Sequence, residues 1–361
     1  MLDIFTEERW AKIQNSYERW WRRETDRPLL HLAFYGGGDL QTPGPEGLVT
    51  EELFRYPAGE PADMIAEKLE YSMRSMRYEH DGFPYVWMYF GPVSAVEFFG
   101  AKAYADANTV WYKAENVPPI EKMRVALDKN SVFYPRYCEI AAALERRFGG
   151  GYAISSSLGG GYCLDMISEF YKPMELCYML YDKPDQVNRL SMDFHKASRD
   201  IGKKLTSLTP SARGYSQWGG LFAPVPWGAM QCDFSAMISP EHFDRFVLWD
   251  LELAVSESPR YNYYHLDGTG QLPHLDSILS IQDLKCVQWV PQAGKPGIGE
   301  WPGVYRKISE AKKNMWVLGS LEDVEAVAGQ IGTTKGLYWQ GRHHISEYDR
   351  VMKAAGRLVS G

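Results

Sequence analysis

The chain has 361 residues, of which 45% are hydrophobic and 24% are charged, a composition typical of a globular protein with a large buried core. The formal net charge of −7 argues against nucleic acid as the main partner, because phosphate binding requires a cationic surface. Five scattered cysteines without a CxxC pair, the lack of an apolar run that could cross a membrane, and the lack of a signal-peptide pattern favour a cytoplasmic protein with reduced thiols.

The first part of the chain mixes helical patterns with single strands. Apolar residues at spacings of three and four predict a helix over residues 6–23, and a strand is expected over 29–35. The Gly- and Pro-rich segment 36–45 is typical of a loop. The further elements expected, in chain order, are a helix over 62–76, a strand over 84–90, helices over 121–147, a strand over 152–157, two helices over 175–205 separated at Pro184, and a strand over 214–218.

From residue 239 onwards, helices and strands alternate strictly. Ser239 and Pro240 are a favourable N-cap and first residue for a helix that extends to about residue 256. The remaining strands are expected over 262–266, 286–290, 315–318 and 336–340, and the remaining helices over 272–280, 304–313, 321–329 and 346–359. Such alternation predicts an α/β fold with parallel strands.

About eight such strands in a chain of this length predict a (β/α)8 TIM barrel, ahead of an open doubly wound sheet. We expect a single domain over residues 1–361, in which residues 1–80 form a mostly helical N-terminal extension packed on the barrel. In both folds the site lies at the carboxyl ends of the strands. The residues that end each strand are therefore the candidates for function.

The strand over 262–266 ends in the segment His265-Leu266-Asp267. Residues i and i+2 of a strand point to the same side, so an imidazole and a carboxylate face one space. Such a pair can bind a divalent metal or act as a coupled acid and base. A third ligand could come from His343 or His344 after the last strand, or from Glu300.

A purely structural explanation of the same residues stays open. His265 could bond to the backbone at a strand end, and Asp267 could cap the following helix. The second pair, His274 and Asp276, lies at the start of a helix, where this spacing sends the side chains to different faces, and is interpreted as structural. Asp233 and Asp165 could reach the site or cap helices, and Cys232 is interpreted as a buried thiol.

Several motifs in order resemble the uroporphyrinogen decarboxylase superfamily, which includes cobalamin-associated, zinc-dependent methyltransferases. The resemblance covers mainly residues 130–361. It rests on Trp218-Gly219-Gly220 followed by CDFSAMISPEHFDRFV, on YYHLDG, and on KCVQWVP and MWVLGSLE. The resemblance implies a (β/α)8 barrel, in agreement with the pattern of elements.

In the zinc methyltransferases of this superfamily, a late strand carries His-x-Cys and a further Cys follows the last strand. His265 matches the histidine, whereas Asp267 stands at the position of the first cysteine and the segment 340–344 replaces the second. A set of nitrogen and oxygen ligands is harder than a thiolate site. The exchange disfavours thiol methylation and leaves demethylation of an O- or N-methyl substrate onto a corrinoid protein.

The resemblance thus implies a methyltransferase with a small-molecule methyl donor, a corrinoid protein as partner and zinc as a Lewis acid. The expected zinc ligands are His265, Asp267 and His344, and the expected catalytic residues are His265, Asp267 and Asp233. Substrate contacts are expected from Trp218, Gln288, Trp289, Trp339 and Gln340. A homodimer is compatible with the pattern, which itself specifies no oligomeric state.

Two other functions remain as alternatives. A decarboxylase could act on a tetrapyrrole or a small aromatic acid, with Asp233 or Asp267 stabilising a protonated intermediate. Against it, the segment RPLLHLAFYGG stands where the true decarboxylases carry an Arg-rich segment that binds the substrate carboxylates. The second alternative is a non-catalytic barrel that binds a corrinoid or tetrapyrrole.

Overall fold

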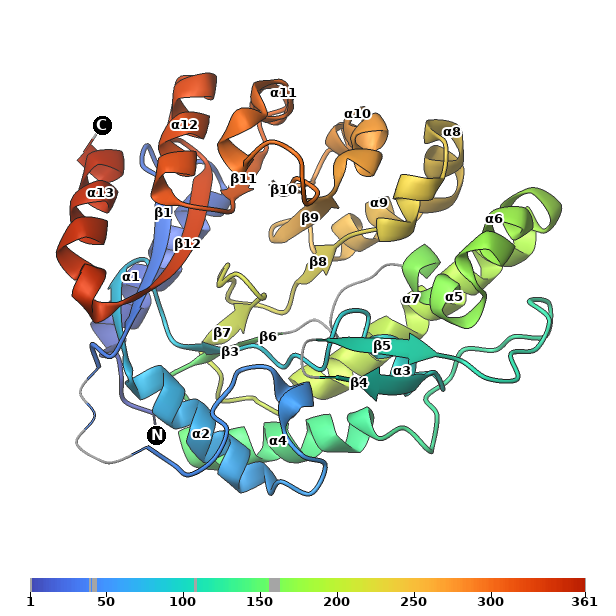
Figure 1. Cartoon of the computed structure of the whole chain (residues 1–361), viewed down its shortest axis with the longest axis horizontal. Coiled ribbons are helices and arrows are strands. Elements are labelled where there is room, and N and C mark those ends of the chain that lie inside the picture. Colours follow the sequence, from blue (N-terminus) through green and yellow to red (C-terminus); the bar gives the residue numbers. More distant parts are fainter. Residues whose placement is uncertain (1, 39, 41–43, 107–108, 156–162, 361) are drawn as a thin grey trace.

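A computed structural model describes residues 2–38, 40, 44–106, 109–155 and 163–360 (Figure 1). Its strands are β1 Leu29–Tyr35, β2 Met76–His80, β3 Tyr85–Val86, β4 Lys102–Ala105, β5 Val110–Lys113, β6 Ala153–Ser155, β7 Gly214–Ser216, β8 Gly228–Met230, β9 Asn262–Asp267, β10 Cys286–Val290, β11 Asn314–Val317 and β12 Leu337–His344. Its helices are α1 Glu7–Trp21, α2 Ala62–Arg74, α3 Ala95–Phe98, α4 Phe133–Phe148, α5 Cys163–Phe170, α6 Pro173–Asp182, α7 Pro184–Thr206, α8 Pro240–Phe243, α9 Trp249–Glu257, α10 Leu275–Ser280, α11 Pro302–Glu310, α12 Leu321–Ile331 and α13 Tyr348–Ser360.

The main sheet has seven strands in the order β2-β1-β12-β11-β10-β9-β8. All neighbours in it are parallel except β1 and β2, which are antiparallel. Parallel neighbours need crossover connections, and α10, α11 and α12 provide them between β9, β10, β11 and β12. These helices and α13 lie along one outer side of the strands in Figure 1.

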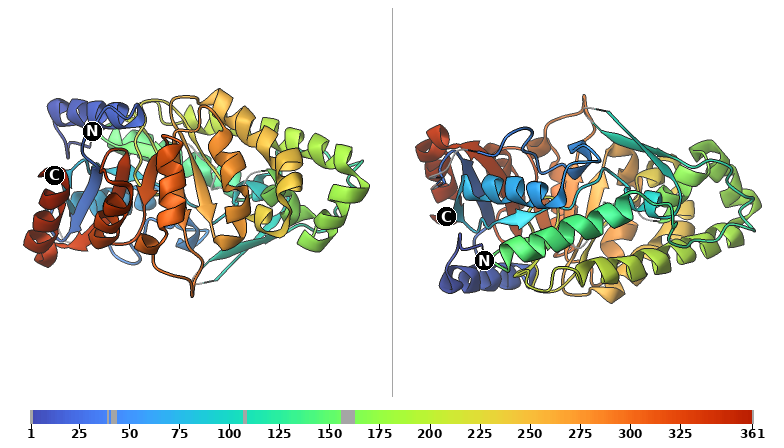
Figure 2. Two further views of the ribbon diagram at one scale, coloured as in Figure 1. Left: turned by 90° about the horizontal axis from the view of Figure 1, so that it is seen from above. Right: turned by 90° about the horizontal axis from the view of Figure 1, so that it is seen from below.

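A second sheet of three parallel strands has the order β3-β6-β7. Helices α2 and α4 lie outside it in Figure 1 and stand in front in the right-hand view of Figure 2, which is seen from below. The strands of the two sheets include all eight that the sequence predicts, which confirms an α/β fold with mostly parallel strands. No ladder joins the two sheets among the described residues, and closure into a complete barrel stays a prediction.

The main sheet buries different side chains on its two faces. Tyr263, Trp316 and Tyr338 point to an inner face and belong to one apolar cluster with residues of the second sheet and of α1. Residues next to them in sequence, among them Tyr264 and Val317, point outward and belong to the larger core beneath the helices. Side chains alternate between the faces of a strand, so each position has a defined face. The inner face of the main sheet is therefore the one that meets the second sheet.

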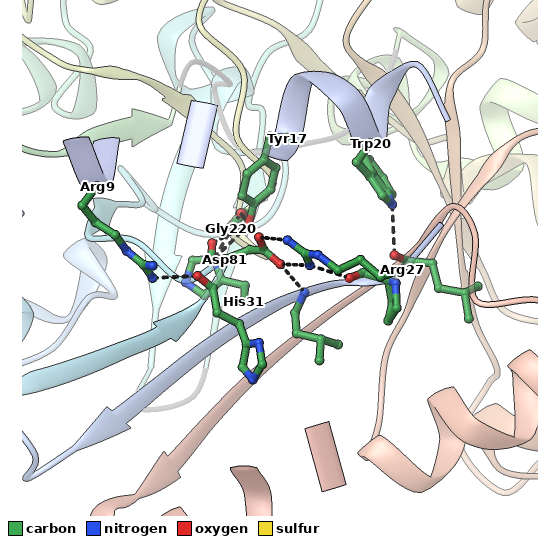
Figure 3. Close-up of polar contacts among 11 residues, drawn as sticks. Arg9, Tyr17, Trp20, Arg27, His31, Asp81 and Gly220 are labelled. Carbon is green, nitrogen blue, oxygen red and sulfur yellow. Dashed lines mark hydrogen bonds and ion pairs between the residues drawn. The ribbon is translucent and has the colours of Figure 1, made fainter. Parts of the chain in front are cut away.

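Helix α1 packs across the starts of β1 and β12, which are far apart in the sequence. Thr6 caps it by accepting a hydrogen bond from the Arg9 amide, and its buried face includes Trp20. The Trp20 indole donates to the carbonyl of Leu337 at 3.0 Å, and the Tyr17 hydroxyl lies 3.1 Å from the carbonyl oxygens of both Asp81 and Gly220 (Figure 3). The N-terminal helix thereby contacts the last strand.

Beside α1, a buried ion pair holds the start of β1. The Arg27 guanidinium donates to both carboxylate oxygens of Asp81, at 2.6 and 2.8 Å, and Asp81 also accepts from the amide of Leu30 (Figure 3). The Asp81 side chain is only 3% exposed, so its charge depends on these donors. The pair fixes the turn between β2 and β3 against β1.

Several predicted bounds change in the structure. The strand expected over 84–90 is reduced to β3, and the helices expected over 121–147 become α4, which begins only at Phe133. The last strand is longer than expected and includes His343 and His344. Residues 156 and 157 of the strand expected over 152–157, and residues 39 and 41–43 of the expected loop, lie outside the described residues. The sequence did not predict β2, β8, the β4–β5 hairpin or α5.

Residues 1–80, the expected extension, supply α1 and α2 but also two strands of the main sheet. Strand β1 pairs with β12 along seven residues, from Leu29 with Tyr338 to Tyr35 with His344. This segment is therefore built into the sheet as well as packed on it. Among the described residues, none of the helices has both the length and the apolar character of a transmembrane segment.

Candidate functional site

His265 lies near the end of β9, on the inner face of the main sheet. Its register partner on β10 is Gln288, which is fully buried and whose Oε1 forms a hydrogen bond with His265 Nδ1. Asp267, two residues further on the same face, places a carboxylate oxygen 3.6 Å from His265 Nε2. Because Gln288 Oε1 can only accept, Nδ1 carries a proton and Nε2 is the nitrogen directed at Asp267. The predicted pair is thus brought together, with Gln288 as an orienting partner.

Asp233 joins this pair from the 3-10 helix Asp233–Met237. Its carboxylate accepts hydrogen bonds from the side-chain amides of Gln271, at 3.2 Å, and Gln231, at 3.1 Å. The buried carboxylate of Asp165 accepts from the backbone amides of Asp233 and Phe234, at 3.1 and 2.8 Å. Asp165 therefore anchors the turn that carries Asp233, which agrees with the capping role that the sequence left open.

The charges of this cluster shift two pKa values upward. Burial raises the pKa of Asp233, and the negative charge of Asp267 raises it further against the opposing effects of His265 and Gln271. Burial acts to lower the pKa of His265, but its hydrogen bonds with Asp267 and Gln288 and the charges of Asp267 and Asp233 outweigh it, so the pKa lies above its ordinary value. The cluster consequently holds an imidazolium more readily than free histidine does.

Aromatic side chains cover the cluster. The ring of Trp218, after β7, meets the ring of His265 edge-on, with the centroids 5.8 Å apart, and its indole donates to the hydroxyl of Tyr263 at 2.6 Å. Trp87 lies 6.4 Å from Trp218 and stacks on Tyr89 at 3.9 Å. The predicted contact residue Trp218 is thus beside His265, whereas Trp87 and Tyr89 were not predicted as site residues.

Gln340, also predicted, lies in a second polar group on the inner face. Its side-chain amide donates to the hydroxyl of Tyr85 at 2.9 Å, and that hydroxyl donates to the carbonyl of Trp218 at 3.0 Å. Arg342 donates to the same hydroxyl at 3.1 Å and to Glu51 at 2.6 Å. This group links β12 to β3 and to the residue that covers His265, and nothing in the sequence beyond their polarity marks Tyr85 or Glu51 as site residues.

Trp289 and Trp339 were expected to contact substrate, but the structure places both on the outer face. Trp289 follows the inward-facing Gln288 and packs edge-on against Trp301 at 5.1 Å. Trp339 donates to the carbonyl of Gly319 at 3.0 Å. Both belong to the core beneath the helices, because neighbours in a strand point to opposite sides. Neither is part of the site around His265.

His344 is likewise distant from His265. The register that runs from His265 through Gln288 and Trp316 reaches β12 at Tyr338, six residues before His344. Six residues of strand correspond to about 20 Å. His344 bonds instead to Ser346, 2.7 Å away, and caps the turn before α13.

The expected zinc site can be tested on its ligands. A structural or catalytic zinc needs at least three protein ligands. Within the described ranges, no three His, Cys, Asp or Glu side chains are grouped so that they could hold a metal ion. Glu300, the other candidate third ligand, bonds to the backbone amide of Gly297 at 2.7 Å. The residues around His265 therefore do not fit the zinc site implied by the resemblance.

The other candidates have structural contacts. His274 is buried, stacks on Phe243 and contacts the carbonyl of Ser235 at 2.8 Å, and Asp276 forms a surface ion pair with Lys307. Cys232 is fully buried, and burial raises the pKa of its thiol. The interpretation of His274 as structural and of Cys232 as a buried thiol is confirmed.

Comparison with known proteins bears on the fold. No protein-family model matches the chain, and no curated protein matches it in sequence. The structure is similar to that of a methyltransferase from Methanosarcina mazei, with a TM-score of 0.61 and 12% sequence identity over 96% of this chain and 98% of that chain. At this identity the likeness shows a shared fold along nearly the whole of both chains.

Proposed function

We propose that the chain is a methyltransferase that uses His265 as a general acid. It would move a methyl group from a small O- or N-methyl substrate to a nucleophilic acceptor. The observation that carries the proposal is the arrangement of Gln288, Asp267 and Asp233 around one imidazole, which favours its protonated form. The structural likeness to an archaeal methyltransferase supports an enzyme of this class.

The acid is needed because methyl transfer leaves an electron pair on the substrate. The bond between the heteroatom and the methyl carbon breaks, and the acceptor supplies the pair for the new bond to carbon. The oxygen or nitrogen left behind is a poor leaving group until it takes up a proton, which His265 Nε2 would give. A positioned general acid contributes about 10²- to 10⁴-fold to rate. Solvent returns the proton to His265 after product release.

The neighbouring residues suit a small, partly apolar substrate. Trp218 and Trp87 offer ring surface beside the imidazole. Gln288 is fully buried, so in this proposal it orients His265 from beneath the site, and the imidazole and the two indole rings contact the substrate.

The resemblance to the cobalamin-associated methyltransferases makes a corrinoid protein the proposed acceptor. Bound to its own protein, a corrinoid supplies a strongly nucleophilic metal centre for methyl groups. The remaining chemistry falls to this chain, which must hold the methyl donor beside His265. Because the residues do not fit a three-ligand zinc site, the proposal assigns the activation of the donor to the proton of His265.

Activity of the purified chain with a reduced corrinoid protein and a panel of methyl ethers and methylamines tests the proposal. His265→Asn keeps a donor at the position of Nδ1 for Gln288 but removes Nε2, so we expect kcat to fall about 10²-fold or more. His242→Asn, at a half-buried position of α8 beside Tyr181 and Phe246, is the matched control and should keep wild-type activity. Release of CO2 from a carboxylated substrate without methyl transfer would instead identify a decarboxylase, and full activity of His265→Asn would refute the role of the imidazole.

A further inference from the structure

A small cavity lies at the opposite end of the main sheet from His265. It has a volume of about 260 Å³ and opens between the end of α1 and the starts of β10 and β11. Five of its nine lining residues are cationic and none is acidic; the cations are Arg22, Arg23, Lys285, Lys312 and Lys313. Such a concentration is unusual in a chain with a net charge of −7.

Two of these cations have acidic partners outside the cavity. Arg22 pairs with Glu24 at 3.0 Å, and Lys285 pairs with Asp283 at 3.1 Å. For Arg23, Lys312 and Lys313, the described part of the chain offers no carboxylate within ion-pair distance. Three cations that form no ion pair with the described carboxylates therefore line one small cavity.

Two of the three are also partly removed from water. Lys313 is only 7% exposed, and its ammonium donates to the carbonyls of Ile281 and Gln282, at 2.8 and 3.0 Å. Arg23 donates to the carbonyl of Lys313 at 2.6 Å. Burial lowers the pKa of both side chains, and the positive charge of Lys285 lowers that of Lys313 further, against a smaller opposing effect of Asp283. An anion in the cavity would stabilise both charges.

The backbone conformation at the cavity also indicates a binding site. Arg23 and Lys312 each follow the end of a helix and adopt left-handed conformations, with φ values of 56° and 57°. Glycine is strongly preferred at this position, because a side chain there is strained. The attraction of cations to helix C-termini accounts for basic residues in a last turn, but not for their use in place of glycine. Strain of this kind concentrates at functional sites.

We propose that this cavity binds a phosphate or a small phosphate monoester. A guanidinium from the end of α1 and two ammonium groups from the turn before β11 match the several oxygens of a tetrahedral dianion better than the planar, singly charged carboxylate. The volume limits the ligand to a small molecule. Ligand binding joins α1 to the starts of β10 and β11, so it stabilises the fold without contact with the site at His265.

Thermal unfolding with increasing inorganic phosphate, at constant ionic strength, tests the proposal. We expect phosphate to raise the Tm of the wild-type chain. Lys312→Gly relieves the left-handed strain and removes one ligand, so its Tm without phosphate should be unchanged or higher while its affinity for phosphate falls about tenfold. Asn116→Gly, at another exposed left-handed position (φ 53°), is the backbone control, and Lys295→Ala is the charge control; both should respond to phosphate like the wild type.

The proposal is overturned if phosphate leaves the wild-type Tm unchanged, or if Lys312→Gly binds phosphate as tightly as the wild type in ³¹P NMR titrations. Titration with glycerol phosphate separates the two sources of the ligand. Tighter binding of the ester than of inorganic phosphate assigns the cavity to an organic phosphate, and equal or weaker binding assigns it to phosphate itself. Either result is independent of methyl transfer.

Discussion

Replacing Asp267 by asparagine tests how the site keeps His265 protonated. The Asp267 oxygen lies 3.6 Å from His265 Nε2, and the Asp267 side chain is 44% exposed. With the dielectric constant of water, two unit charges at this distance attract by about 1.2 kcal/mol, which corresponds to roughly 0.8 pKa unit. Burial of the histidine weakens the screening, whereas exposure of the aspartate restores it. We therefore expect Asp267→Asn to lower the pKa of His265 by about one unit.

The measurement is a pH titration of the imidazole ¹H–¹⁵N correlations, in which His265→Asn identifies the signal among the eight histidines. In the proposed reaction the protonated ring is the active form, so kcat falls as pH rises through the pKa of His265. Asp267→Asn should move this descending limb to lower pH by the same amount. A titration curve of His265 that does not change, or that moves to higher pH, would refute the electrostatic reasoning.

The same proton links the site to stability. The folded-state pKa of His265 lies above its unfolded value of about 6.5, so its contribution is complete below that pH and is lost as pH rises through the folded pKa. The pKa of Asp233 is also raised, so its contribution to stability is complete below the ordinary carboxyl pKa of 3.8 and is lost as pH rises through the folded-state pKa. In urea denaturation, the free energy of unfolding of Asp267→Asn should fall less than that of the wild type as pH rises through the pKa of His265.

Two further predictions concern the packing that holds the site. Arg27→Met leaves the buried carboxylate of Asp81 without its two guanidinium donors, so we expect the free energy of unfolding to fall by about 3 kcal/mol in urea denaturation; a loss under about 0.5 kcal/mol would contradict the role of the pair. Gly219→Ala would place a methyl group within the ring of Trp316, so we expect a loss of about 3 kcal/mol or more in thermal unfolding. Gly303→Ala, whose new methyl group meets open space, is its control, and equal Tm values for the two variants would show that the overlap is relieved at no cost.

The sequence predicted the eight parallel strands well because buried strands carry long apolar runs and the helices between them carry their own periodicity. It was less successful with residues that pair at long range. Strand β2 pairs with β1, but only its first residue lies within an expected element, the helix over 62–76. Strand β8 is three residues long, too short for a periodic signal. Such elements form because a partner strand is present, which the local sequence does not encode.

The candidate site likewise combines residues that the strand pattern predicts with residues that depend on contacts between distant segments. His265, Asp267 and Gln288 could be predicted together because two positions in one strand and one in the next share a face. Trp289 could have been excluded by the same alternation, since it follows Gln288 directly. The position of His344 depended on the length of β12, which the pattern ended four residues too early. Asp233 comes close through a turn anchored by Asp165, a contact between distant segments.

The pairing of β1 with β12 has a consequence for biosynthesis. Strand β1 leaves the ribosome long before its parallel partner, which is completed only at residue 344. Until then the nascent chain carries an apolar strand with one unpaired edge, and the indole of Trp20 lacks its acceptor at Leu337. Unpaired edges invite association between chains, and contacts so distant in sequence slow the final step of folding. The antiparallel pairing of β1 with the nearby β2 protects the other edge of β1 during synthesis, so the edge that later pairs with β12 is the one that chaperones must shield on this strand.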